Sequence, residues 1–183
     1  GPGAADLITV RGRDILERAE VVIYTGSLVS KEHLEYCRPD AQIYNSAGMT
    51  LEDVMEIMTM EEQMGKTVVR LHTGDPSIYG AIREQMVELD RVGIQYEVVP
   101  GVSSFTGAAA AINREFTLPG VTQTVILTRI EGKTPVPETE DLERLASVGA
   151  SMAIFLSVSM IDKVVEKLKK GYKKNVAVAV VER

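Results

Sequence analysis

The stretch that decides the fold is Thr67–Gly80, with the sequence TVVRLHTGDPSIYG. Its first part, Thr67–Leu71, is rich in β-branched and apolar residues, which predicts a buried strand that ends at His72. Gly74 permits a sharp turn, and Pro76 suits the first turn of a helix. A strand, a glycine-bearing turn and a helix in this order form the unit of a parallel α/β sheet, which binds ligands beyond the carboxyl ends of its strands.

The helix that follows this turn is expected to include Ile78–Leu89. Asp75 directly precedes Pro76, and an aspartate often caps a helix by accepting a backbone N–H. The spacing alone is therefore equally consistent with a capped structural turn and with a ligand-binding loop.

Similar units lie on both sides of this stretch. Strand-like runs alternate with helical patterns in the N-terminal half, at Val21–Tyr24, Ala41–Tyr44 and Gln95–Val99. The clearest helix is Thr50–Met64, where Thr50 and Asp53 have the spacing of a capping box and Gly65 follows the last turn. Five of the eight methionines lie in or beside this helix, and core packing is the favoured interpretation for them.

The pattern repeats after Pro100-Gly101. It predicts a helix of small residues, three strands and an apolar helical stripe, at Ser103–Ile112, Thr122–Thr128, Ser151–Leu156, Val176–Val181 and Ile161–Leu168. We therefore expect two α/β domains, residues 1–100 and 101–183. GPGAADL at the start is turn-like and would normally follow a strand, and the last strand stops within the sheet, so both termini are expected to be incomplete.

Composition and charge argue against several functions. The net charge is −6, with 20 Lys and Arg against 26 Asp and Glu, which disfavours nucleic-acid binding. Cys37 is the only cysteine, and it and the two histidines have no zinc-ligand spacing. The sequence contains no long apolar run and no leader pattern, so we expect a cytoplasmic protein that does not enter a membrane.

The motifs narrow the chemistry further. Neither GxGxxG nor a Walker motif is present, and no serine or carboxylate pair has the context of a hydrolase. A second loop, VVPGVSSFTGAAAA at residues 98–111, combines a turn, two serines at a helix start and small residues that allow close backbone approach. Ser103 or Ser104 is equally suited to capping the helix and to contacting a ligand.

Five blocks together resemble the ordered signature of the tetrapyrrole methylase family. They are GPGAADLITVRG, YTGSL, HTGDPSIYG, VVPGVSSFTGAAAA and TQTVILTR. The longer stretches NSAGMTLEDV, EFTLPGVTQTVILTR and GKTPVPE resemble the branch of the family that methylates C11 of precorrin-4 or cobalt-precorrin-4 in cobalamin biosynthesis.

The resemblance implies two α/β domains, with S-adenosyl-L-methionine bound in the cleft between them, and a homodimer. Methyl transfer then leaves S-adenosyl-L-homocysteine. The residues implied at the cofactor are Pro2, Gly74, Asp75, Ile78, Tyr79, Ser103, Ser104, Phe105 and Leu156. For a substrate rich in carboxylates, we expect Arg129 and Lys133 to bind the charges, while Ser46 and Met49 line the substrate trough.

Some assignments stay open. The family often has an acid directly after GPG, where this chain has Ala4, with Asp6 two positions later. Because a C11 methylation removes no proton from the attacked carbon, no catalytic base is assigned. Cobalt-containing and metal-free substrates both remain possible, with cobalt favoured by overall likeness. The alternatives are a relative that modifies a protein histidine or ribosomal RNA, and a non-catalytic cofactor-binding module.

Overall fold

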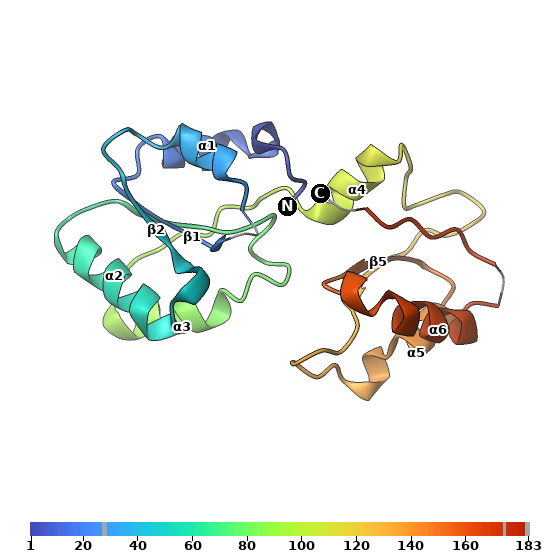
Figure 1. Ribbon diagram of the computed structural model, residues 1–183. Coiled ribbons are helices and arrows are strands. Elements are labelled where there is room, and N and C mark those ends of the chain that lie inside the picture. Colours follow the sequence, from blue (N-terminus) through green and yellow to red (C-terminus); the bar gives the residue numbers. More distant parts are fainter. Residues whose placement is uncertain (27–28, 174, 182–183) are drawn as a thin grey trace. The chain divides into compact units, whose positions relative to one another are not determined.

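The computed structural model describes residues 1–26, 29–173 and 175–181, drawn as coloured ribbon in Figure 1. Ser27 and Leu28, the end of the YTGSL block, lie outside the described residues. The chain forms two compact units that divide between Ala108 and Ala109. Each unit contains a parallel sheet with helices packed on it, which confirms the predicted α/β class.

The first unit contains a three-stranded parallel sheet. Its strands are β1 (Val21–Tyr24), β2 (Gln42–Asn45) and β3 (Val68–Leu71), in the order β2-β1-β3. Tyr24 pairs with both Asn45 and Leu71, so the three strands end at the same level. Three of the four strands expected in this half are thus confirmed, two of them with ends shifted by one residue.

Helices cover both faces of this sheet, as Figure 1 shows. Val21 and Ile23 face α2 (Leu51–Gln63) and α3 (Arg83–Val92), whereas Val22 packs with Leu16 of α1 (Val10–Leu16). All four side chains of β1 are buried, so this strand contributes apolar surface to both layers of the core. Each fully buried valine or isoleucine contributes about 1.5–3 kcal/mol of hydrophobic stabilisation.

Helix α2 begins with the predicted capping box. Thr50 Oγ1 accepts the Asp53 N–H at 3.2 Å, and Asp53 Oδ2 accepts the Thr50 N–H at 2.8 Å. Met55 and Met58 are buried in the core and Met49 packs against it, whereas Met60 and Met64 of the same group are exposed. The predicted core role is therefore confirmed for Met49, Met55 and Met58 and wrong for Met60 and Met64.

The helix after the glycine turn begins later than predicted. Residues 72–82 form bends and turns, and α3 starts at Arg83 and not at Pro76. Tyr79 and Ala81 have φ values of 54° and 49°, a left-handed conformation that a right-handed helix cannot contain. The interpretation of Asp75 as the cap of a helix at Pro76 is wrong for the same reason.

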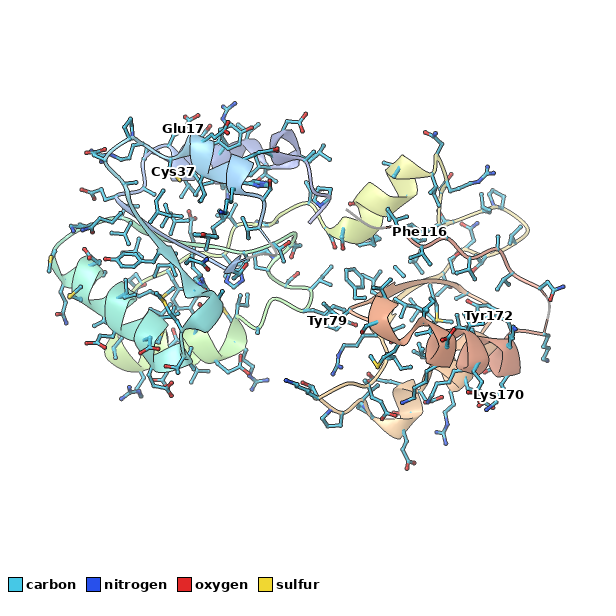
Figure 2. The ribbon with its side chains drawn as sticks, viewed as in Figure 1. Glu17, Cys37, Tyr79, Phe116, Lys170 and Tyr172 are labelled. Carbon is cyan, nitrogen blue, oxygen red and sulfur yellow. The ribbon has the colours of Figure 1, made fainter. Side chains whose placement is uncertain are left out.

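The second unit contains the parallel pair β4 (Val125–Arg129) and β5 (Ser151–Phe155). Helices α5 (Leu142–Ser147) and α6 (Ile161–Gly171) pack together, with Leu142, Ala146, Val164 and Leu168 buried. A Cβ atom at Gly171 would lie only 2.5 Å from Ala146 Cβ, so the two helices approach closely there. Lys170 and Tyr172, labelled in Figure 2, mark the end of α6, where Tyr172 Oη donates to Ala150 O at 2.5 Å.

The remaining elements are short. Helix α4 (Ser104–Ala111) follows the second glycine loop, close to the predicted Ser103–Ile112. Short 3-10 helices connect the others: η1 (Ala5–Leu7), η3 (Lys31–Tyr36), η4 (Ser46–Gly48), η5 (Glu138–Glu140) and η6 (Val158–Met160).

Two predicted strands are absent from the described residues. Gln95–Val99 and Val176–Val181 have no strand pairing, and every residue from Val176 to Val181 is exposed, not buried. Both segments have the composition of a strand. A strand also needs a neighbour that accepts its backbone hydrogen bonds, and neither segment has one in the described part of the chain.

Candidate functional site

Two glycine-bearing loops of the first unit pack backbone against backbone. A Cβ atom at Gly101 would lie 2.0 Å from Gly74 O and 3.3 Å from Asp75 Cα. Gly74 has a φ of 63°, and a Cβ there would lie 3.3 Å from Gly1 Cα and 3.6 Å from Ser103 Cα. The loops can therefore meet only because these positions carry no side chain.

The carboxylate of Asp75 joins these loops. Asp75 Oδ2 accepts the Gly101 N–H at 3.0 Å, while Oδ1 accepts the Ser77 N–H at 2.9 Å and the Ser77 hydroxyl at 2.5 Å. The Ser77 hydroxyl is the main cause of a lowered Asp75 pKa, with the two backbone N–H groups adding to it against desolvation. Asp75 is consequently ionised at neutral pH and crosslinks the two loops.

The N-terminal GPG segment is the third part of this loop cluster. The Gly1 amine donates to Thr73 Oγ1 at 2.6 Å, and a Cβ at Gly107 of α4 would lie 2.6 Å from Pro2 Cβ. Residues 1–3, 73–77 and 101–107 thus form one backbone-lined cluster, which we call the loop cluster.

The structure brings most predicted cofactor residues of the first unit to this cluster. Ser103 is buried, and Ser104 and Phe105 open helix α4 beside it. Neither serine hydroxyl makes a hydrogen bond to another residue of the described ranges, so both are available to a ligand. Ile78 and Tyr79 lie on the loop that leads away from Asp75, with Tyr79 44% exposed (Figure 2).

The other predicted residues lie in the second unit. Leu156 follows β5 with a φ of 53° and is 69% exposed. Arg129 ends β4, and its Nη atoms donate to the carbonyl oxygens of the loop that follows, whereas Lys133 is exposed on that loop. The guanidinium of Arg129 is therefore engaged within its own unit, which the sequence pattern did not indicate.

Ser46 and the half-buried Arg70 meet near the ends of the first sheet. Ser46 Oγ donates to Tyr24 O at 3.0 Å and accepts from Arg70 Nη1 at 2.8 Å, and Arg70 Nη1 also donates to Ile23 O at 3.2 Å. Arg70 Nε is buried without a partner among the described residues, and none of them places a carboxylate within ion-pair distance of Arg70. Sequence reasoning missed Arg70, although a lone arginine in the apolar strand VVRL was a signal.

His72, directly after β3, is uncharged at neutral pH. Burial and then the nearby Arg70 cation lower the pKa of its imidazole to about 4. A neutral imidazole and a half-buried guanidinium thus lie at the carboxyl end of β3, where α/β sheets bind ligands.

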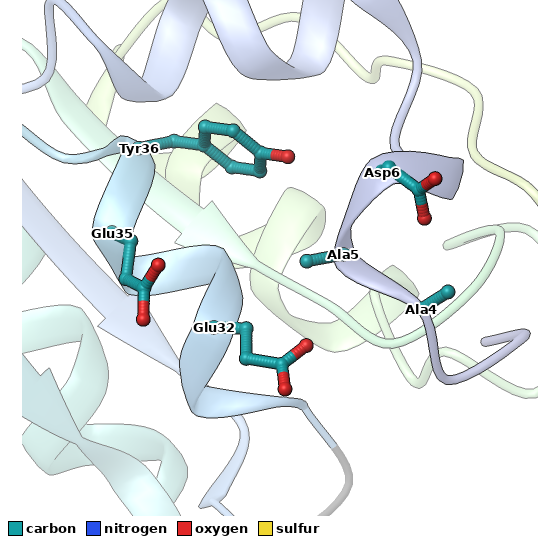
Figure 3. A pocket seen from close by; sticks show the side chains of 6 residues that line it. All are labelled: Ala4, Ala5, Asp6, Glu32, Glu35 and Tyr36. Atoms are coloured by element: carbon teal, nitrogen blue, oxygen red, sulfur yellow. The ribbon is translucent and has the colours of Figure 1, made fainter.

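A separate cavity of about 320 Å³ lies beside the residues that follow GPG, and Figure 3 shows its lining. It is formed by Ala4, Ala5, Asp6, Glu32, Glu35 and Tyr36. Three of these side chains are carboxylic acids, so the cavity repels an anionic ligand. Across the described ranges, no group of three or more His, Cys, Asp or Glu side chains has an arrangement that could hold a metal ion.

Within the described residues, no helix combines the length and the apolar character needed to cross a bilayer.

Comparison with curated proteins and solved structures identifies relatives over almost the whole chain. It is 56% identical over 182 residues to a cobalt-precorrin-4 C(11)-methyltransferase of Methanocaldococcus jannaschii, a match that covers 99% of this chain and 70% of that protein. It is 48% identical over 183 residues to a precorrin-4 C(11)-methyltransferase of Mycobacterium tuberculosis, which covers 99% of this chain and 73% of the relative.

Two solved structures are also similar. A cobalt precorrin-4 methyltransferase, described as a cobalamin biosynthetic enzyme, matches with a TM-score of 0.91 and 49% identity over 94% of this chain and 73% of that one. A uroporphyrin-III C-methyltransferase of Thermus thermophilus complexed with S-adenosylhomocysteine matches with a TM-score of 0.70 and 26% identity over 94% of this chain and 70% of that one. The family model described as Tetrapyrrole (Corrin/Porphyrin) Methylases matches residues 1–183. The chain therefore belongs to the tetrapyrrole methylase family.

Proposed function

We propose that this chain is an S-adenosylmethionine-dependent methyltransferase that methylates C11 of cobalt-precorrin-4 in cobalamin biosynthesis. The observation that carries the proposal is the 56% identity, over 99% of the chain, to a relative named for this reaction. The loop cluster supports it, because a backbone-lined, glycine-dependent surface with free hydroxyls suits a small polar cofactor.

The residues of the loop cluster fit S-adenosylmethionine. Its ribose hydroxyls and amino-acid group need hydrogen-bond donors and acceptors, which the hydroxyls of Ser103 and Ser104 and the backbone of the two loops can supply. The ionised Asp75 places a negative charge beside a ligand that carries a sulfonium cation. The residues proposed to hold the cofactor are Pro2, Gly74, Asp75, Ile78, Tyr79, Ser103, Ser104 and Phe105 of the first unit and Leu156 of the second.

The cofactor, when bound, supplies an electrophilic methyl group. The protein must then hold the nucleophilic ring carbon about 3–3.5 Å from that methyl, in line with the departing sulfur. A backbone-lined cluster crosslinked by Asp75 is suited to this task, because it fixes the ligand without mobile side chains. No proton leaves the attacked carbon, so no residue is assigned as a base.

The proposed substrate carries many carboxylates, and the protein must bind them despite its charge of −6. Lys133 is an exposed cation with no ion pair or hydrogen bond to the described residues, and we propose that it binds a carboxylate directly. Ser46 and Met49 are proposed to line the substrate trough beyond the ends of β1 and β2. Arg129, also expected from the sequence to bind the substrate, donates its Nη hydrogens to carbonyl oxygens of the loop that carries Lys133, and we propose that it serves substrate binding through that loop.

The cobalt-containing substrate is favoured over the metal-free one. The relative from M. jannaschii and the solved structure at 49% identity are both named for cobalt-precorrin-4, whereas the relative at 48% identity is named for precorrin-4. Cobalt would belong to the substrate and not to a metal site of the protein.

We also propose that the enzyme is a cytoplasmic homodimer that binds no nucleic acid. The family resemblance suggests the dimer, the proposed compartment is in line with the lack of a membrane-spanning helix among the described residues, and the excess of acidic residues argues against a nucleic-acid partner. Light scattering on a sized sample should give twice the mass of one chain; a monomer over the working concentration range would refute the dimer.

The reaction is tested by incubating the full-length enzyme with S-adenosylmethionine and either cobalt-precorrin-4 or precorrin-4. Mass spectrometry should detect a gain of one methyl group, faster with the cobalt substrate, and NMR of the product should locate it at C11. No methyl gain, or a methyl at another ring position, would overturn the proposal. A Gly101→Ala variant, in which the added Cβ would clash with Gly74 O, should lose methyl transfer, and Gly48→Ala, whose Cβ meets no atom within 4 Å, is the matched control.

A further inference from the structure

The side chain of Arg129 is directed at the backbone of the loop that carries Lys133. Arg129 Nη1 donates to Ile130 O at 3.4 Å and to Thr134 O at 3.1 Å, and Nη2 donates to Pro135 O at 3.2 Å. Both terminal nitrogens of the guanidinium therefore hold carbonyl oxygens that flank Lys133. A planar guanidinium can reach several acceptors at once, which a lysine ammonium on a flexible stem does not reproduce.

Few other interactions hold the backbone of this loop. Residues 130–137 contain no helix or strand, and within this described segment Gly132 N donates to Thr134 O at a long 3.4 Å. Glu131 pairs with Lys163 at 3.2 Å, but both side chains are about half exposed, and such surface pairs contribute little. Ile130 anchors the start of the loop, because its side chain is buried in the core and its N–H donates to Ser157 Oγ at 3.0 Å. Beyond Ile130, the bonds from Arg129 to Thr134 O and Pro135 O are the side-chain hydrogen bonds that hold the loop's backbone among the described residues.

The two cations divide their roles. Arg129 is half-buried and bonded to carbonyl oxygens, whereas Lys133 is exposed and makes no hydrogen bond or ion pair to the described residues. We infer that Arg129 is a positioning residue, which fixes the loop so that Lys133 is presented to a substrate carboxylate. This inference rests on the proposed function for the role of Lys133, but not for the bracing of the loop.

A double-mutant cycle tests the inference with the full-length enzyme. Arg129→Ala and Lys133→Ala should each raise the KM for cobalt-precorrin-4 about tenfold, the loss expected for one charge-assisted contact, with kcat little changed. If Arg129 acts only through Lys133, the double variant should be no worse than Lys133→Ala alone. Additive effects would mean that Arg129 contacts the substrate itself and would overturn the inference. Arg144→Ala, an exposed arginine on α5, is the matched control and should leave KM unchanged.

A second measurement reads the loop directly. Trypsin cleaves after Lys133, and it should cut Arg129→Ala about tenfold faster than the wild type, because the braced loop must open before it enters the protease. Arg129→Lys keeps the charge and should also be cut faster, which covers the case in which the alanine variant fails to fold. Cleavage at the wild-type rate in a folded variant would refute the bracing. If the wild type does not methylate cobalt-precorrin-4 at all, the proposed function fails, and the cleavage rates still decide whether Arg129 braces the loop.

Discussion

Replacing Gly101 with alanine should separate the two glycine-bearing loops. The added Cβ would lie 2.0 Å from Gly74 O, whereas real Cβ atoms essentially never approach a neighbour within 3.0 Å. The atoms involved are backbone, so the loops must move apart by at least about 1 Å. The hydrogen bond from Gly101 N to Asp75 Oδ2, now 3.0 Å, would then break.

A hydrogen bond to a charged group contributes about 1.5–3 kcal/mol, and each 1.4 kcal/mol is a factor of ten in affinity. We therefore expect Gly101→Ala to weaken S-adenosylhomocysteine binding at least about tenfold in isothermal titration calorimetry. Gly48→Ala is the control, since no atom lies within 4 Å of a Cβ at that position and its φ is not left-handed. Wild-type affinity in a folded Gly101→Ala variant would refute the role of the loop contact, as would an equal loss in Gly48→Ala.

Three further predictions concern charge and burial in the first unit. Asp75→Asn should lower the melting temperature at pH 7. The difference between variant and wild type should persist above pH 3.8 and disappear as the pH falls through the lowered pKa of Asp75, because the carboxylate is then protonated. A difference in melting temperature that remains at pH 2 would contradict the prediction. The low pKa of His72, about 4 against 6.5 for an unperturbed imidazole, means that wild-type stability is lost as the pH falls from 6.5 to 4. The free energy of unfolding, measured with urea, should be about 1–2 kcal/mol lower at pH 5 than at pH 7 in the wild type, and His72→Gln should remove this difference. If the unfolding free energy of the variant falls with pH as much as that of the wild type, the prediction is refuted. Lys66→Met should destabilise by about 3 kcal/mol in thermal unfolding, because it leaves the carboxylate of Glu61 buried without its cation. Adding Glu61→Leu should restore most of that loss, and Lys170→Met, in an exposed pair, should cost less than about 1 kcal/mol.

Much of the fold follows from local signals in the sequence. Strands β1 and β3 were predictable because they are rich in apolar and β-branched residues, VVIY in β1 and VVRL in β3, as is typical of strands in a parallel sheet. Helix α2 was predictable because Thr50 and Asp53 satisfy each other's backbone N–H groups whatever the rest of the chain does. The same signals overestimated Val176–Val181, since strand composition does not supply a neighbouring strand.

The candidate site was predictable in outline only. Glycines and serines at two predicted strand–helix junctions indicated ligand loops, and although the strand before the second loop is absent, the structure brings Gly74, Asp75 and Ser103 together. The bonding of Arg70 and Arg129 could not be predicted, because it depends on carbonyl groups whose direction is set by the folded loops. The late start of α3 was hidden as well, since Tyr79 and Ala81 give no sign in sequence of their left-handed backbone.

The loop cluster also has a consequence for how the first unit folds. Gly1 meets Thr73 across 72 residues, and Thr9 Oγ1 donates to Pro100 O across 91. Contacts between such distant segments close large chain loops, so they are costly in entropy and are expected to form late in folding. A ligand bound there would then stabilise the entire unit and not a local surface, by about 2.7 kcal/mol at a concentration one hundred times its Kd. The buried amides of β1 would then exchange more slowly with solvent as soon as the cofactor is added.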